Sequence, residues 1–139
     1  MSKISQQKGK AGEEMAVWYL KSIGAKCIEK ISTPMINVKG KAVYCKQSSI
    51  DYLALLFFGP ETGYRACRIE VKQCDSDRLH HSRLRPHQIK WLLDWNNYNN
   101  YSFVLWVHKT ECFLFRYPNH KFTKGHSLSV EDAKKVSLQ

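Results

Sequence analysis

Arg68-Ile69-Glu70-Val71-Lys72-Gln73 is a short run in which apolar and charged residues alternate. Because side chains of a β-strand point alternately to its two faces, the run predicts a strand with Ile69 and Val71 on one face. Glu70 and Lys72 then lie on the other face. A carboxylate and an ammonium group therefore share one surface, while the opposite surface is apolar.

The partner of this strand is predicted from the residues that precede it. The apolar run from Ile50 to Phe58 contains Asp51 near its start and is typical of a strand covered on both faces. The Gly- and Pro-containing segment 59–63 is strong turn sequence, so Tyr64 to Gln73 is expected to return as the antiparallel partner. Such a hairpin brings Asp51 near Glu70, within reach of one metal ion.

The length and the net charge of the chain indicate its domain number and the kind of partner it binds. With 139 residues, of which 43% are hydrophobic, the chain is expected to be a single domain over 1–139, with a core of about 8–117 and a tail of 118–139. The net charge of +10, from 22 Lys and Arg against 12 Asp and Glu, favours a polyanionic partner, first of all nucleic acid. Ribosomal proteins, other basic enzymes and membrane-surface proteins share this excess.

No apolar run approaches the roughly 20 residues that cross a bilayer, and the Lys- and Gln-rich start is unlike a secretory signal. We therefore expect a cytoplasmic location (the host cytoplasm if a phage encodes the chain) and no membrane partner. The five cysteines are odd in number and irregularly spaced, which indicates reduced thiols. Cys67 and Cys74 with His80 and His81 could suggest zinc, but no Cys-x-x-Cys pair supports it.

Helices are predicted at three places. Apolar residues at helical spacing predict a helix from about Lys10 to Ile23, with Gly24 as its stop signal and residues 1–8 frayed before it. Pro86 is well placed in the first turn of a second helix that ends near Asn97. Ser129, with Asp132 three residues later, could cap a short final helix.

The remaining segments are predicted as strands and loops. Further strands are expected at 27–31, 41–46, 101–107 and 111–117, with a loop or an irregular edge at 32–40 and a loop at 74–85. Consecutive hairpins joined by a helical crossover predict an α/β fold, with a central mixed β-sheet flanked by helices.

The charged face of the hairpin carries the chemistry. Two carboxylates, Asp51 and Glu70, with the backbone carbonyl of Val71 and several waters, suit Mg²⁺, for which Mn²⁺ may substitute. Lys72 lies on the side of Glu70 and could orient or activate a water and offset charge on a phosphate. Glu-x-Lys alone is common on solvated strands. The combination with Asp51 in a basic chain suggests a nuclease.

Two helical residues could complete this site. Glu13 shares a face with the apolar stripe of the first helix, and it could bind the metal or hold a catalytic lysine. A favourable helix-dipole placement is the plainer explanation, and Glu14 competes for either role. Gln88, just after Pro86, could hydrogen-bond a water or a phosphate oxygen, or could be an ordinary exposed residue.

Basic residues near the predicted site suit DNA backbone phosphates, although a solvated basic loop would look the same. Three tryptophans, Trp91, Trp95 and Trp106, lie at apolar phases and are more typical of a core than of a stacking platform. The residues predicted to bind DNA are Lys39, Lys41, Arg78, His80, His81, Arg83, Arg85 and Lys90.

Together these residues resemble the PD-(D/E)xK nuclease superfamily. The resemblance rests on the segment 9–14 opening a helix, Asp51 at a strand start, Glu70-Val71-Lys72, and Gln88 in the next helix. It covers roughly residues 8–117 and is strongest to the small Holliday-junction resolvases of archaea and phages and the related VRR-type nucleases. Ile50 stands where the name of the motif expects proline.

The resemblance implies a restriction-endonuclease-like core and metal-dependent hydrolysis of a DNA phosphodiester, leaving a 5′-phosphate and a 3′-hydroxyl. Asp51, Glu70 and the Val71 carbonyl would bind Mg²⁺, and Lys72 would assist the attacking water. Glu13 would be the acidic residue of the first helix, and Gln88 would match the helix glutamine of several branches.

The leading hypothesis is therefore a structure-selective endonuclease that resolves Holliday junctions in DNA recombination and repair. A homodimer is expected, because two symmetric cuts need two active sites. A restriction-type or repair nuclease on the same scaffold is the alternative enzyme. A non-catalytic nucleic-acid-binding module is the alternative from another class.

Overall fold

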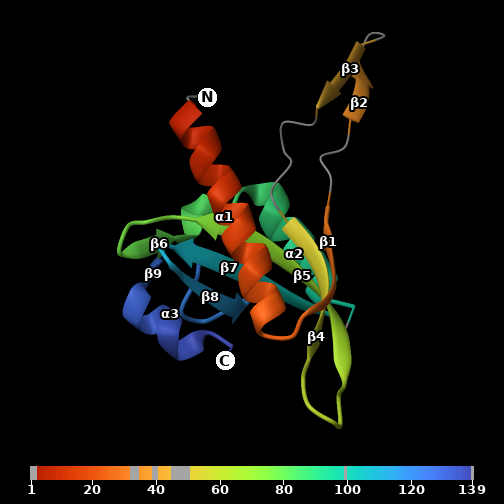
Figure 1. Cartoon of the computed structure of the whole chain (residues 1–139), viewed down its shortest axis with the longest axis vertical. Helices are drawn as coiled ribbons and strands as arrows, with labels where there is room; N and C mark the ends of the chain where they lie inside the picture. The colour runs from red at the N-terminus through yellow and green to blue at the C-terminus, as the bar shows by residue number, and fades with distance from the viewer. Residues whose placement is uncertain (1–2, 32–34, 39–40, 45–50, 99, 139) are drawn as a thin grey trace.

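A computed structural model of the chain describes residues 3–31, 35–38, 41–44, 51–98 and 100–138 (Figure 1). Its centre is a five-stranded sheet of order β1-β4-β5-β7-β8. Only β5 and β7 are parallel among these neighbours, and helix α2 lies between them in sequence as the crossover. The predicted α/β class, with a mixed sheet flanked by helices, is confirmed.

The bounds of the sheet strands follow the apolar runs of the sequence closely. The turn segment 59–63 and the hairpin at residues 109–110 lie where turn residues predicted them. The strands of the sheet are β1 (Lys26–Lys30), β4 (Asp51–Phe57), β5 (Tyr64–Gln73), β7 (Tyr101–His108) and β8 (Glu111–Arg116).

Helix α1 (Lys3–Ser22) crosses one face of the sheet (Figure 1). Ala16 and Leu20 are fully buried there against Ile69 and Val71 of β5, and Gly24, with φ of +86°, follows the helix as predicted. The helix begins at Lys3, so the prediction of a frayed segment before Lys10 was wrong for residues 3–8. Lys, Gln and Ser are acceptable helix formers, and a helix already nucleated by its buried stripe extends at small cost.

The opposite face of the sheet is covered by α2 (Pro86–Asn96) and α3 (Val130–Val136). Leu92 of α2 and Ala133 of α3 pack in one cluster with Trp106 of β7 and Phe115 of β8. The Ser129 hydroxyl accepts a hydrogen bond from the Asp132 backbone N–H at 3.1 Å, which confirms the predicted cap. We call this cluster, on the α2 and α3 side of the sheet, the second core, and the C-terminal segment is part of it.

Two segments contain short strands: 74–85, which was predicted as a loop, and 32–40, which was predicted as a loop or an irregular edge. In the segment 74–85, β6 (Arg78–His80) pairs with β9 (Ser127–Ser129) and is followed by a 3₁₀ turn, η1 (His81–Arg83). In the segment 32–40, β2 (Met35–Val38) pairs with β3 (Lys41–Tyr44). A three-residue strand has no periodicity of its own, and the partner of β6 is distant in sequence, so local patterns miss it.

Within the residues that the structure describes, no helix is long and apolar enough to cross a membrane.

The packing of α2 can be tested at two adjacent leucines. Leu92 is 1% exposed in the second core, whereas Leu93 is 37% exposed. We expect Leu92→Ala to lower the free energy of unfolding by about 2–5 kcal/mol, because it leaves a cavity between helix and sheet. Leu93→Ala should change it by less than about 1 kcal/mol. Urea denaturation followed by circular dichroism measures both, and equal losses would contradict this packing.

Candidate active site

Asp51 and Glu70 are directly paired residues of the antiparallel strands β4 and β5. Residues that face each other across such a pair project to the same side of the sheet, about 4.5–5.5 Å apart at Cβ. Both side chains lie on the side of α2, and each residue is only 2% exposed. The structure thus brings together the two carboxylates that the hairpin predicted.

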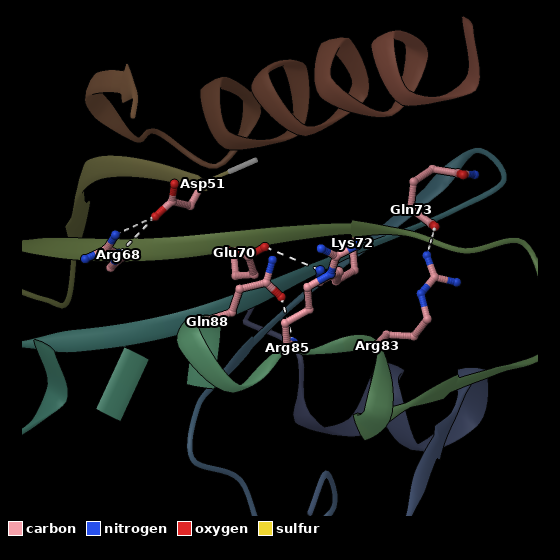
Figure 2. Close-up of polar contacts among 8 residues, drawn as sticks. All are labelled: Asp51, Arg68, Glu70, Lys72, Gln73, Arg83, Arg85 and Gln88. Carbon is pink, nitrogen blue, oxygen red and sulfur yellow. Dashed lines mark hydrogen bonds and ion pairs between the residues drawn. The ribbon is translucent and has the colours of Figure 1, made fainter. Parts of the chain in front are cut away.

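Each carboxylate has a cationic partner on β5 (Figure 2). Arg68 donates from Nε to Asp51 Oδ2 at 2.9 Å, and its Nη2 lies 2.8 Å from the same oxygen. Lys72 Nζ lies 3.5 Å from Glu70 Oε1. Arg68 was missed in the sequence, although its position two residues before Glu70 places it on the same strand face.

Burial dominates the electrostatics of the cluster. It raises the pKa of Asp51, an effect that the hydrogen bond and charge of Arg68 oppose. Burial also lowers the pKa of Lys72. The charge of Glu70 opposes this shift, and the charges of Arg83 and Arg85 add to it. The two arginines from the segment before α2 therefore lie close enough to act on Lys72.

His87, in the first turn of α2, is a second neighbour of the cluster. Burial lowers its pKa, as do the charges of Arg85 and Lys72, while Asp51 opposes the shift. Its ring packs edge-on against Trp91, with centroids 5.1 Å apart. The first turn of α2 therefore lies near Asp51 and Lys72.

The Val71 carbonyl is directed toward the edge of β5 on which β4 lies. The Cys74 N–H bonds to the Val107 carbonyl at 3.0 Å, so Cys74 directs its peptide group toward β7. Successive residues of a strand direct their hydrogen-bonding groups to opposite edges, so Val71 faces the other way. Asp51 begins β4 on that side, opposite Glu70.

These donors suit a hard divalent cation. Mg²⁺ takes oxygen ligands and keeps several waters, so two carboxylates and a carbonyl are enough. Among the described residues, no group of three or more His, Cys, Asp or Glu could hold a metal, so this candidate site rests on two carboxylates and a carbonyl. Burial raises the pKa of Cys67 to about 12, which leaves it a thiol rather than a zinc-binding thiolate.

Glu13 lies on α1 and forms an ion pair with Lys30 of β1, with Nζ 3.1 Å from Oε2. The glycine before it allows α1 to come close to β5, since a Cβ at Gly12 would lie 3.0 Å from Gln73 Cβ. The lysine that Glu13 holds is Lys30 rather than Lys72, and α1 covers the face opposite the carboxylates. Its role at a metal stays a prediction. Glu14 is exposed.

Gln88 is buried, at 3% exposure, so it is not an ordinary exposed helix residue. Its Oε1 accepts a hydrogen bond from the Arg85 backbone N–H at 2.9 Å, which caps the start of α2. The rest of its amide points toward Glu70 (Figure 2). Gln88 therefore links the helix start to the carboxylate cluster.

Most of the predicted DNA-binding residues in the segment before and within α2 are exposed. Arg78 donates to the Ser127 hydroxyl at 2.6 Å, and Arg83 Nη2 donates to the Gln73 carbonyl at 3.0 Å. The exposed set comprises Arg78, His80, Arg83, Arg85 and Lys90. Lys39 and the side chain of Lys41 lie outside the residues that the structure describes.

His81 is the exception among these residues. It is 5% exposed, and its Nε2 lies 2.8 Å from the Tyr117 hydroxyl. Its ring also packs against Phe122, with centroids 5.0 Å apart. The assignment of His81 to a DNA-binding surface is therefore withdrawn, because its ring is part of the second core.

The mixed sheet and the two carboxylates with Lys72 on adjacent strands have the arrangement of a PD-(D/E)xK-type nuclease core. Compared with known protein families, the chain matches the family described as Recombination protein U over residues 13–139. The chain therefore belongs to the Recombination protein U family, whose members are resolvases of Holliday junctions in recombination. No curated protein matches the chain. The narrower likeness to archaeal, phage and VRR-type nucleases stays a prediction.

The burial of His81 predicts how the stability of the folded chain depends on pH. Burial, with a smaller contribution from Lys124, lowers its pKa in the folded chain below the 6.5 of a free histidine. The unfolded chain therefore takes up the proton first, and protonation favours unfolding. His81→Gln cannot be protonated and keeps an amide for Tyr117.

We expect the wild type to lose stability relative to His81→Gln as pH falls below about 6.5, with no change in their difference above it. Thermal unfolding from pH 7.5 to 5.0 measures this, with His80→Gln, an exposed neighbour, as the control. A constant difference between wild type and His81→Gln would show that His81 is not held neutral by burial.

Proposed function

We propose that the chain is a divalent-cation-dependent endonuclease that hydrolyses DNA phosphodiester bonds at four-way junctions. Membership of the Recombination protein U family supports a role as a Holliday junction resolvase. The observation that supports the cation and the residues is the register of β4 and β5, which pairs Asp51 with Glu70 and sets Lys72 beside them.

In this proposal Asp51, Glu70 and the Val71 carbonyl hold Mg²⁺ or Mn²⁺. When bound, the cation would supply polarisation of the phosphate and activation of a water. Lys72, whose Nζ lies 3.5 Å from Glu70, orients that water and offsets negative charge as it develops on the phosphate. Because Lys72 is mostly buried, little bulk water screens its charge.

The segment before α2 would hold the DNA backbone. Arg83 and Arg85 are exposed and act electrostatically on Lys72, so phosphates bound to them lie next to the cluster. Gln88 accepts a hydrogen bond from the Arg85 backbone N–H and so fixes the start of α2, next to the arginines that would contact the phosphates. A homodimer follows from the substrate, because two symmetric cuts across a junction need two active sites.

Two isosteric variants test the cluster. We expect Glu70→Gln and Lys72→Met each to lower the rate of cleavage of a synthetic four-way junction in Mg²⁺ at least about 100-fold. Junction binding, measured by gel shift in EDTA, should survive, since the exposed arginines are untouched. Glu61→Gln, at an exposed turn position, is the matched control and should cut at the wild-type rate.

Wild-type cleavage rates in Glu70→Gln and Lys72→Met would rule out the proposed active site.

The choice of DNA substrate separates the alternative functions. A linear duplex cut as efficiently as the junction would favour a restriction-type or repair nuclease. Binding to junction, flap, linear and single-stranded DNA without cleavage of any of them would favour a non-catalytic module.

A further inference from the structure

Arg68 holds Asp51 in a way that bears on cation binding. Its Nε and Nη2 both lie within 2.9 Å of a single carboxylate oxygen, Oδ2. The Asp51 side chain is 3% exposed, so this oxygen has a guanidinium where a solvated carboxylate would have water. A charge-assisted contact of this kind is among the stronger hydrogen bonds in proteins.

The guanidinium has a second contact that does not depend on Asp51. Its Cζ lies 5.0 Å from the centre of the Trp91 ring, in cation–π geometry. Trp91 is itself packed by His87 from the same helix. Because Trp91 packs against the guanidinium, Arg68 would keep one contact within the site if it released Asp51.

We propose that Arg68 exchanges partners when the substrate and the cation bind: it occupies Asp51 Oδ2 in the cation-free protein and transfers to a DNA phosphate when a divalent cation takes that oxygen. This inference rests on the proposed function, since it requires a cation at Asp51. Guanidinium groups bind carboxylates and phosphates with the same planar fork, so the exchange needs no new type of contact.

The exchange couples two binding events. In the absence of DNA, a cation must displace Arg68 from Asp51, so its affinity is low. With a phosphate present to receive the guanidinium, the displacement costs less, and the cation binds more tightly. By linkage, the cation raises DNA affinity by the same factor. The site would then load its cation only on substrate.

Calorimetric titration with Ca²⁺, with and without a four-way junction, tests this coupling. Gel analysis afterwards checks that the DNA is intact, and a titration of DNA alone is subtracted. In Arg68→Met we expect Ca²⁺ to bind the free protein roughly tenfold more tightly than it binds the wild type, because the competing contact is gone. The gain in Ca²⁺ affinity on adding DNA should shrink by a similar factor.

Arg65→Met is the matched control. Arg65 lies on the same strand and is exposed, so the variant loses the same charge without touching Asp51. It should behave as the wild type. Arg68→Lys keeps the charge without the fork and should give an intermediate result. It also carries the test if thermal melting shows that Arg68→Met is unfolded.

The outcomes separate this inference from the proposed function. If Asp51→Asn and Glu70→Gln bind Ca²⁺ as the wild type does, the proposed cation site itself fails. If those variants lose Ca²⁺ but Arg68→Met matches the wild type, or keeps the full gain from DNA, the site stands and the exchange by Arg68 is wrong.

Discussion

The antiparallel register of β4 and β5 is the constraint on which the site depends. The turn between these strands has Gly59 and Gly63 at φ of +96° and +70°, and the Phe58 N–H bonds to the Gly63 carbonyl at 2.9 Å. A slip of one residue would move every side chain of one strand to the other face. Asp51 would then face α1, away from Glu70, and no pair of carboxylates would exist.

Buried charge is the second feature that organises this part of the molecule. Asp51 and Glu70 are among the least exposed residues of the described chain, and each is matched by a cation from β5. Removing one partner of such a pair typically costs about 3–5 kcal/mol, whereas apolar residues of similar size would pack there at no electrostatic cost. A cluster of this composition is therefore better explained by chemistry than by stability.

Helix α2 turns the strand pair into a site. Pro86 begins it, and the bond from the Arg85 N–H to Gln88 closes its first turn. That turn places His87 near Asp51 and Lys72, and one turn later Trp91 contacts Arg68. The exposed arginines just before the helix lie beside Lys72. One short segment thus supplies both the wall of the site and basic groups suited to a phosphate backbone.

Local sequence was sufficient to locate the five strands of the central sheet and the three helices, because each depends on neighbours in the chain. Alternation in 68–73 and the glycines of the turn predicted the hairpin, and with it the meeting of Asp51 and Glu70. Contacts between distant segments could not be predicted in this way. The pairing of β6 with β9 and the burial of His81 against Tyr117 join residues 49 and 36 positions apart. The choice of Arg68 as the partner of Asp51 depends on how the side chains pack across the hairpin. Periodicity and turn chemistry report only on the nearest residues, so the partner of each charge was decided by how the sheet and its helices pack.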